Sequence, residues 1–178
     1  GDLLVFPGGV DPHVHMQLPV AGTVSSDDFE SGTAAAVAGG TTTIVDFVHP
    51  ERGQDFLEAL ESRKREAAKA VADYGLHMAV TWWGEETRGW IERCVREEGV
   101  SSFKIYMAYL ATVGLQDDDL VRVLETPADL DALVLVAPWL RTRETIDLPT
   151  QVGVLLSQPF TPERRSEERF SRNAETGC

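Results

Sequence analysis

The chain has 178 residues, of which 43% are hydrophobic, and a formal net charge of −13. This length suffices for one domain with a substantial apolar core. The acidic balance argues against nucleic acid as a partner, because phosphate binding requires a basic surface, and no apolar run is long enough to predict a membrane span.

Apolar, β-branched runs alternate with helical patterns along the first 136 residues. Runs of this kind, closed by Gly or Pro, are typical of buried strands. A polar loop at 17–26 follows the first of them, and Ser25 or Ser26 is the expected N-cap of the first helix, which ends at Gly39-Gly40. The predicted strands are 3–10, 41–48, 76–83, 101–108 and 133–136. The remaining predicted helices are 55–74, 86–98 and 117–124.

This alternation predicts an α/β fold in which helices cover a parallel sheet. The sheet can be either doubly wound or part of a barrel. In both arrangements the chemistry gathers at the carboxyl ends of the strands. His13, His15, His49 and Tyr109 all lie at such ends in the sequence.

The pair His13 and His15 is the first candidate site. Side chains two residues apart on an extended segment point to the same side, and imidazole is a common ligand of zinc. The alternative is a pair of surface or loop histidines. The setting favours a metal site, because an apolar strand leads into the pair and Asp11 lies close enough to support a ligand.

Lys104 is the second candidate, because it interrupts an apolar, β-rich run. An unpaired buried ammonium is costly. One interpretation is that the side chain reaches out to solvent at the strand end. The other is a lysine whose pKa is lowered for a chemical role.

The two cysteines, Cys94 and Cys178, indicate neither a disulfide framework nor a CxxC metal site. A reducing, cytoplasmic location is therefore expected. From residue 138 the strand and helix patterns stop, and prolines and charged residues dominate. We therefore expect a first domain at 1–137 and an unrelated or frameshifted, poorly ordered tail at 138–178.

Four stretches of the chain resemble the cyclic amidohydrolases, specifically the dihydropyrimidinase and D-hydantoinase family. They are PGGVDPHVHMQLP (7–19), SSDDFESGTAAAVAGGTTTIVDFV (25–48), LHMAVTWW (76–83) and SFKIYMAY (102–109). Together they extend over most of residues 3–124, and their density makes the resemblance specific.

The resemblance implies a TIM-type barrel with two divalent metals, usually zinc. His13 and His15 match metal ligands, and Lys104 matches a lysine that is carboxylated on its amine and bridges both metals. Tyr109 matches a tyrosine that binds the substrate carbonyl and stabilises the oxyanion, and the loop 16–24 matches a gate of the pocket. The implied reaction opens a small cyclic diamide, such as a dihydropyrimidine or hydantoin, to an N-carbamoyl amino acid. The family forms homo-oligomers, typically tetramers.

The resemblance also implies that the chain carries only part of this barrel, about the first four to five β/α units. The family takes two further histidines and an aspartate from later strands, whereas Ala137 stands here where the next histidine is expected. No histidine follows His77. His49 and His77 match no ligand position and are interpreted as structural.

One alternative is a non-enzymatic product, either an inert fragment or an assembly partner. The collapsin-response mediator relatives share the fold and act as non-enzymatic scaffolds, but they lack metal ligands, whereas His13, His15 and Lys104 are present here. A nucleotide-binding α/β protein is disfavoured, because no GxGxxG or GxxxxGK[ST] motif follows any predicted strand.

Overall fold

The computed structural model describes residues 4–20, 22–108, 110 and 112–137. All of them belong to the first of the two units into which the chain divides, Gly1–Arg141. The predicted boundary between residues 137 and 138, and the tail expected beyond it, lie outside the described residues and stay predictions.

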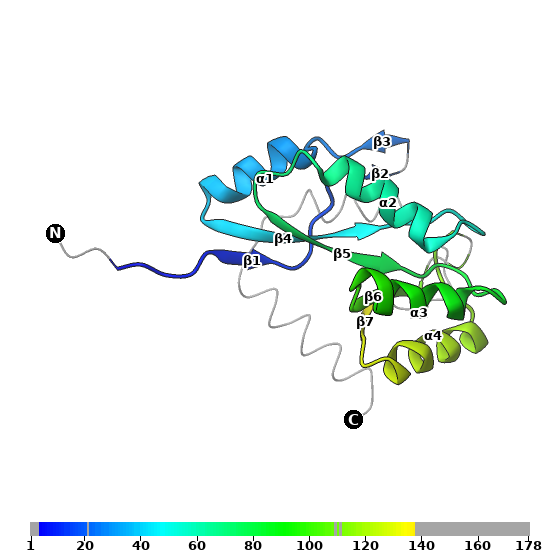
Figure 1. Ribbon diagram of the computed structural model, residues 1–178. Helices are drawn as coiled ribbons and strands as arrows, with labels where there is room; N and C mark the ends of the chain where they lie inside the picture. Colours follow the sequence, from blue (N-terminus) through cyan, green and yellow to red (C-terminus); the bar gives the residue numbers. More distant parts are fainter. Residues whose placement is uncertain (1–3, 21, 109, 111, 138–178) are drawn as a thin grey trace, which may run out of the picture. The chain divides into compact units, whose positions relative to one another are not determined.

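A parallel sheet of five strands forms the centre of the described part of the chain (Figure 1). Its order is β1 (Gly9–Asp11), β4 (Thr41–Val48), β5 (Asp73–Ala79), β6 (Ser102–Tyr106) and β7 (Leu133–Ala137). Each strand is added beside the preceding one, on the same side. A doubly wound sheet reverses its strand order at a switch point, whereas a barrel does not. The sheet is thus a partial barrel, which confirms the predicted fold class.

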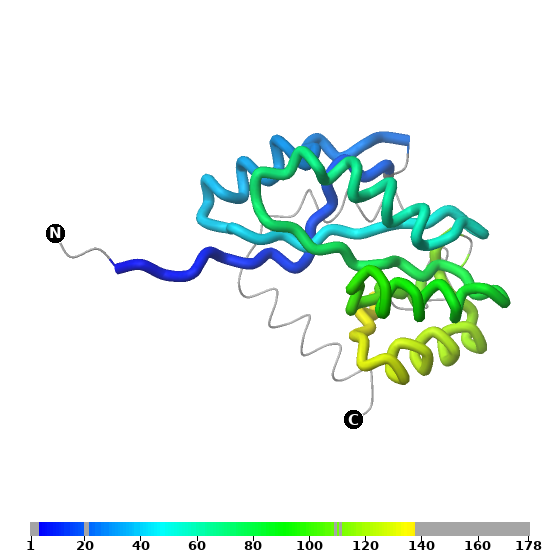
Figure 2. Tube along the Cα trace, viewed as in Figure 1, coloured from blue at the N-terminus to red at the C-terminus, as the bar shows by residue number. Residues whose placement is uncertain are grey.

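Each connection between neighbouring strands of the sheet contains one helix, and the helices pack against one another in chain order (Figure 2). Glycines end two of these helices, with Gly99 at a φ of 69° after α3, as expected from a C-terminal glycine. The helices are α1 (Phe29–Ala38), α2 (Phe56–Ala67), α3 (Thr87–Glu98) and α4 (Asp117–Asp129).

The sheet has two different faces. On the helix-covered face, alternate strand residues such as Val48, Met78 and Phe103 pack in one apolar core with Phe56 and Ile91 of α2 and α3. The opposite face carries the residues in between, which include the candidate site residues described below. This division follows from the alternation of side chains along a strand.

The predicted helix at 55–74 is too long, and the strand after it begins earlier than predicted. α2 ends at Ala67, and β5 begins at Asp73, where Asp73 pairs with Thr43 and Tyr74 with Ile44. Ala70 and Val71 continue the helical spacing, but they lie in the connection. There the Val71 N–H donates to the Thr33 hydroxyl at 3.0 Å, so a tertiary contact outweighs the local pattern.

The first strand is shorter than the predicted 3–10, because pairing with β4 covers only Gly9–Asp11. The polar loop after it contains a small antiparallel hairpin, β2 (Pro19–Val20) and β3 (Thr23–Val24). The N-cap of α1 is Asp28, and not Ser25 or Ser26. Asp28 accepts from the Ser31 N–H at 2.9 Å, whereas Ser25 has a different role, described below.

α4 extends beyond the predicted end at residue 124 and includes Pro127. A proline in the last turn removes one backbone donor, and the helix ends two residues later at Asp129. Smaller differences affect two strands, since β6 ends at Tyr106 and β7 includes Ala137.

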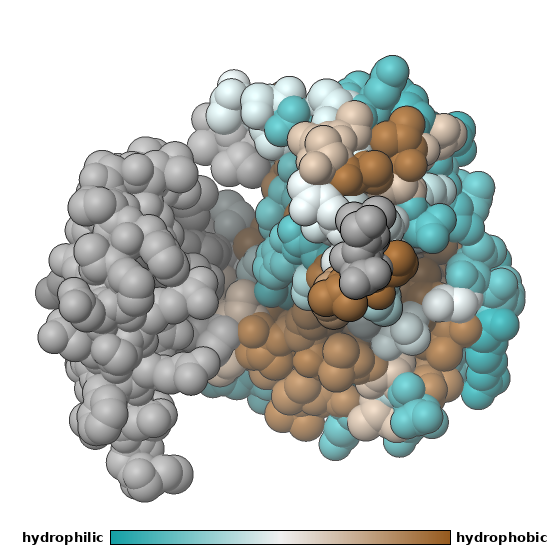
Figure 3. Space-filling view, turned by 90° about the vertical axis from the view of Figure 1, so that its left-hand side faces the viewer, coloured by the Kyte–Doolittle hydropathy of each residue, from teal (hydrophilic) through white to brown (hydrophobic). Residues whose placement is uncertain are grey.

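Apolar side chains are exposed near the start of the described chain, and the view in Figure 3 shows apolar side chains gathered on the face toward the viewer. Leu4, Val5 and Phe6 are between 76% and 93% exposed, and Val10 of β1 is 62% exposed. Within the described residues, no helix combines the length and apolar character that crossing a membrane requires.

Candidate metal centre

His13 and His15 directly follow the carboxyl end of β1, and their rings lie side by side. Their Nε2 atoms are 3.3 Å apart, and their ring centroids are 5.1 Å apart. The Val14 N–H donates to the Val45 carbonyl at 3.1 Å, which attaches the segment to β4. Asp11 accepts from the backbone N–H of His13 at 3.1 Å and so orders the turn into the pair. The sequence prediction of two imidazoles on one side is confirmed.

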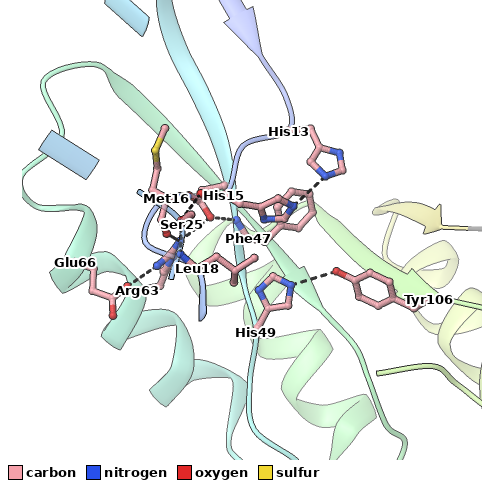
Figure 4. A network of polar contacts seen from close by, with 11 residues as sticks. His13, His15, Met16, Leu18, Ser25, Phe47, His49, Arg63, Glu66 and Tyr106 are labelled. Carbon is pink, nitrogen blue, oxygen red and sulfur yellow. Dashed lines mark hydrogen bonds and ion pairs between the residues drawn. The ribbon is translucent and has the colours of Figure 1, made fainter. Parts of the chain in front are cut away.

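Phe47 of β4 lies at the centre of the polar sheet face (Figure 4). Its ring contacts three histidines from two segments, and the Nζ atom of Lys104 lies 5.7 Å from its centroid. The ring centroids of His13, His15 and His77 lie 4.6, 4.8 and 4.9 Å from that of Phe47. The aromatic ring thus gives the candidate site an apolar floor.

Lys104 lies on β6 and is only 8% exposed, so the side chain does not reach out to solvent. Its Nζ atom lies over the rings of Phe47 and Tyr106. Among the described residues no carboxylate pairs with it, and burial lowers the pKa of its ammonium. A buried, unpaired lysine of this kind is a candidate for chemistry on its neutral amine.

The candidate ligands favour the neutral imidazole that a metal requires. Burial, followed by the positive charge of Lys104, lowers the pKa of His13. Burial, followed by the neighbouring His13, lowers the pKa of His15. The Nδ1 atom of His15 is buried and has no hydrogen-bond partner among the described residues.

His77 has a structural role, as interpreted from the sequence. Both of its ring nitrogens are used, since Nδ1 lies 2.6 Å from the Ser102 hydroxyl and Nε2 lies 3.0 Å from the Pro12 carbonyl. These contacts join β5 to β6 and to the segment that precedes His13. The ring therefore has no nitrogen free for a metal.

His49 follows the end of β4, and its Nε2 atom lies 3.2 Å from the Tyr106 hydroxyl. Figure 4 shows these two side chains pointing toward each other. Burial lowers the pKa of His49 to about 4, and burial raises the pKa of Tyr106. The pair borders the candidate site, because the His49 ring lies 6.1 Å from that of His15.

Tyr109, the predicted substrate-binding and catalytic residue, lies outside the described residues, and its role stays a prediction. Within the part of the chain that the structure describes, no three His, Cys, Asp or Glu side chains converge as a metal site. His13 and His15 are the two candidate ligands whose ring nitrogens lie close together, and Lys104 lies on the same face of the sheet.

Sequence reasoning missed Asp46 and Arg63, which hold the backbone beside His15. Asp46 is a lone carboxylate in the apolar run Thr41–Val48, the same signal that singled out Lys104. Arg63 lies three residues after Leu60 and four before Ala67, so it shares the buried face of α2. Both signals were present in the sequence.

Comparison with known proteins decides the family. A sequence profile of the Amidohydrolase family matches residues 4–134. The chain belongs to this family. Dihydropyrimidinase of Dictyostelium discoideum is 48% identical over 136 residues, which are 76% of this chain and 27% of that protein. D-hydantoinase of Geobacillus stearothermophilus is 44% identical over 133 residues, which are 74% of this chain and 28% of that protein.

Solved structures of amidohydrolases superpose on the same part of the chain. Dihydropyrimidinase from Brevibacillus agri NCHU1002 gives a TM-score of 0.71 at 41% identity. The matched region covers 73% of this chain and 28% of the Brevibacillus chain. A crystal structure of D-hydantoinase also gives 0.71, at 42% identity, over 74% of this chain and 29% of that one. The chain thus spans less than a third of the length of these amidohydrolase relatives.

Proposed function

We propose that this chain supplies the first part of the active site of a metal-dependent hydrolase that opens cyclic amides. The observation that carries the proposal is the pair of imidazole nitrogens 3.3 Å apart, beside a buried lysine on the same sheet face. The names of the relatives, dihydropyrimidinase and D-hydantoinase, point to dihydropyrimidines and hydantoins as substrates. They do not favour the scaffold alternative.

The residues present fit a divalent metal, and zinc is the expected ion. Neutral imidazoles are good zinc ligands. The Nδ1 atom of His15 has no hydrogen-bond partner among the described residues, so no hydrogen bond to the protein at this atom explains the orientation of the ring. His13 and His15 would hold one metal, and a modified Lys104 would be shared between two. When bound, such metals polarise an amide carbonyl and lower the pKa of an attacking water.

Lys104 can become a metal ligand by reacting with carbon dioxide. The neutral amine attacks the carbon atom, an N–C bond forms, and one proton leaves the nitrogen for solvent. The product is an N-carboxylated lysine with a negative charge and two oxygen donors. Burial favours the neutral amine that this reaction needs, and an anion suits two cations better than an ammonium does.

The overall reaction consumes one water and breaks the ring C–N bond of the cyclic amide. The carbonyl carbon becomes a carboxylate, and the nitrogen stays on the ureido group of an N-carbamoyl amino acid. Tyr109 is proposed to donate a hydrogen bond to the developing oxyanion. His13, His15 and Lys104 would hold the metals, and the Phe47 ring packs against the two histidine rings.

Assembly and location belong to the same proposal. We expect homo-oligomers, which are typically tetramers in the dihydropyrimidinase and D-hydantoinase family. We also expect a reducing, cytoplasmic compartment. The pKa of Cys94, raised to about 12 by burial, is consistent with a free thiol that plays no part in a disulfide.

The function is tested by measuring the zinc content of the protein and of two variants, with zinc and bicarbonate present. We expect His13→Ala and His15→Ala to contain less zinc than the unmodified protein, because each removes a proposed zinc ligand. Ring opening of dihydrouracil and hydantoin is measured in a protein in which the rest of the barrel completes the site, and it should be lost in both variants. Equal zinc content in the unmodified protein and both variants, or equal turnover in the completed proteins, overturns the proposal.

The modification of Lys104 has its own arm in this experiment. The ¹³C NMR spectrum recorded with ¹³C-bicarbonate should show a carbamate carbon signal in the unmodified protein. The signal should be absent in Lys104→Arg, because the guanidinium of arginine stays protonated and offers no neutral amine to carbon dioxide. Lys69→Arg is the matched control, because Lys69 is half exposed and pairs with Asp28 at the surface. A carbamate signal that persists in Lys104→Arg contradicts the assignment.

A further inference from the structure

A buried ion pair lies directly behind the histidine pair, on the helix-covered face of the sheet. The Asp46 carboxylate of β4 is fully buried, and Arg63 of α2 is 9% exposed. The Arg63 Nη2 atom lies 2.9 Å from the Asp46 Oδ1 atom. Removing two charges from water is costly, and further hydrogen bonds to both groups are needed to offset that cost.

Both members of the pair bind the backbone of Met16. The Met16 N–H donates to the Asp46 Oδ2 atom at 2.8 Å, and the Arg63 Nη2 atom donates to the Met16 carbonyl at 2.6 Å. Asp46 also accepts the N–H of Phe47, the residue on which the histidine rings rest. One ion pair therefore satisfies both backbone groups of the residue next to His15.

The side chain of Met16 is fixed as well. It is buried with Phe29 of α1 and Ile44 of β4. A Cβ atom at Gly32 of α1 would lie 2.3 Å from the Met16 sulfur, so the glycine leaves the space that Met16 fills. The backbone of Met16 is thus held by hydrogen bonds, and its side chain is held by packing.

His15 is held from its other side by Ser25. The Ser25 hydroxyl donates to the His15 carbonyl at 3.0 Å and accepts the Leu18 N–H at 2.7 Å. Figure 4 shows Arg63 and Glu66 approaching the segment from α2, whereas the His13 ring lies on the far side of Phe47. The peptide group between His15 and Met16 is therefore hydrogen-bonded at both its carbonyl and its N–H.

We infer that Asp46 and Arg63 are positioning residues for His15, and through it for the histidine pair. Because successive side chains of an extended segment alternate in direction, clamping Met16 toward the helices directs His15 toward the polar sheet face. Directional, charge-assisted hydrogen bonds define this geometry more tightly than apolar contacts can. The role in metal binding rests on the proposed function, whereas the orientation of His15 can be tested without a metal.

The ion pair of Asp46 and Arg63, together with its hydrogen bonds to the Met16 backbone, is called the clamp below. The test uses variants of both charged residues. Asp46→Asn keeps an oxygen for the Met16 N–H but removes the charge that Arg63 needs, and Arg63→Met removes both of its hydrogen bonds in the clamp. Arg63→Lys keeps the charge and is the rescue variant. Glu66→Gln is the matched control, because it weakens the other contact of Arg63, Nη1 to Oε2 at 2.5 Å, and leaves the clamp intact.

The first readout is the ring NMR signal of His15 in metal-free protein, together with its nuclear Overhauser contacts to Phe47. Asp46→Asn and Arg63→Met should lose these contacts, Arg63→Lys should retain part of them, and Glu66→Gln should match the unmodified protein. Ile91→Ala, which is destabilised in the large apolar cluster that does not include Met16, should keep the contacts while it remains folded. This variant separates positioning from general stability.

The second readout is zinc affinity, measured by competition with a chromophoric chelator. We expect Asp46→Asn and Arg63→Met to bind zinc about 10- to 100-fold more weakly, as is usual when a group that orients a ligand is removed. Unchanged His15 contacts in both clamp variants overturn the inference, as does an equal loss in Ile91→Ala. If the unmodified protein binds no zinc, the proposed function fails, and the metal-free NMR readout alone decides the positioning role.

Discussion

Lys104 is a buried cation on the polar face of the sheet, a position that is costly for stability. Its side chain is 8% exposed, it lies over two aromatic rings, and burial lowers the pKa of its ammonium. A methionine of similar length would suit this apolar position better. Residues that reduce stability in this way are often retained for function.

We therefore predict that Lys104→Met stabilises the protein in buffer that contains a chelator and no bicarbonate. The free energy of unfolding should rise by about 1–3 kcal/mol, the usual penalty for a buried polar group without a partner. Urea unfolding, followed by tryptophan fluorescence, measures the change.

Lys69→Met is the control for this prediction, because Lys69 is half exposed and its replacement should change stability little. A Lys104→Met variant that is less stable than the unmodified protein in this buffer would show that the ammonium has a stabilising partner.

Helix α1 illustrates how one residue among several suitable ones becomes the N-cap that starts a helix. Ser25, Ser26, Asp27 and Asp28 can all cap a helix. Tertiary contacts decide between them, because the Ser25 hydroxyl is bound to the His15 carbonyl. Asp28 caps the helix and pairs with Lys69 at 3.0 Å.

The cap predicts a pH dependence. The Ser31 backbone N–H, followed by Lys69, lowers the pKa of Asp28 from 3.8 to about 2. A lowered carboxyl pKa stabilises the folded state above the unfolded pKa, and this stabilisation is lost as the pH falls through about 2. The melting temperature of the unmodified protein should exceed that of Asp28→Asn at neutral pH, and the difference should narrow below about pH 4.

Lys69→Met separates the two causes. It removes the ion pair and keeps the hydrogen bond from Ser31, which has the larger effect on the pKa. Most of the pH dependence should therefore remain in Lys69→Met. A melting-temperature difference between the unmodified protein and Asp28→Asn that stays constant down to pH 2 contradicts the assignment.

At the scale of the whole molecule, the sheet divides apolar packing from chemistry. One face packs against the helices through a large apolar cluster and a smaller one that contains Met16 and Phe29, and the other face carries the histidines and Lys104. Stability and the candidate site therefore depend on different residues of the same strands.

This division predicts that core variants on the helix side destabilise the fold. Ile91 of α3 is fully buried, and Ile91→Ala should reduce the free energy of unfolding by about 2–5 kcal/mol, since it leaves a cavity. Val121→Ala is the matched control in α4, because Val121 is 54% exposed. Its effect in chemical denaturation should stay within about 0.5 kcal/mol, and a comparable loss in both variants contradicts the assignment of the core.

Much of this organisation could be predicted, and the errors have a common origin. The strands 41–48 and 133–136, the alternation of elements and the paired histidines follow from periodicity, which is a local property. The end of α2 and the start of β5 do not, because Ala70 and Val71 fit a helix equally well until β5 pairs with β4. Strand pairing is decided between segments that are distant in the chain.

The sequence by itself determined the parallel α/β class, the family resemblance and the candidate residues His13, His15 and Lys104, because residue type, spacing and alternation carry them. Only the tertiary structure decided that the strands follow one another as in a barrel. It also showed that Asp46 and Arg63 hold the backbone beside His15. The physical reason is that a hydrogen bond between residues 16 and 63 joins segments whose local patterns contain no information about each other.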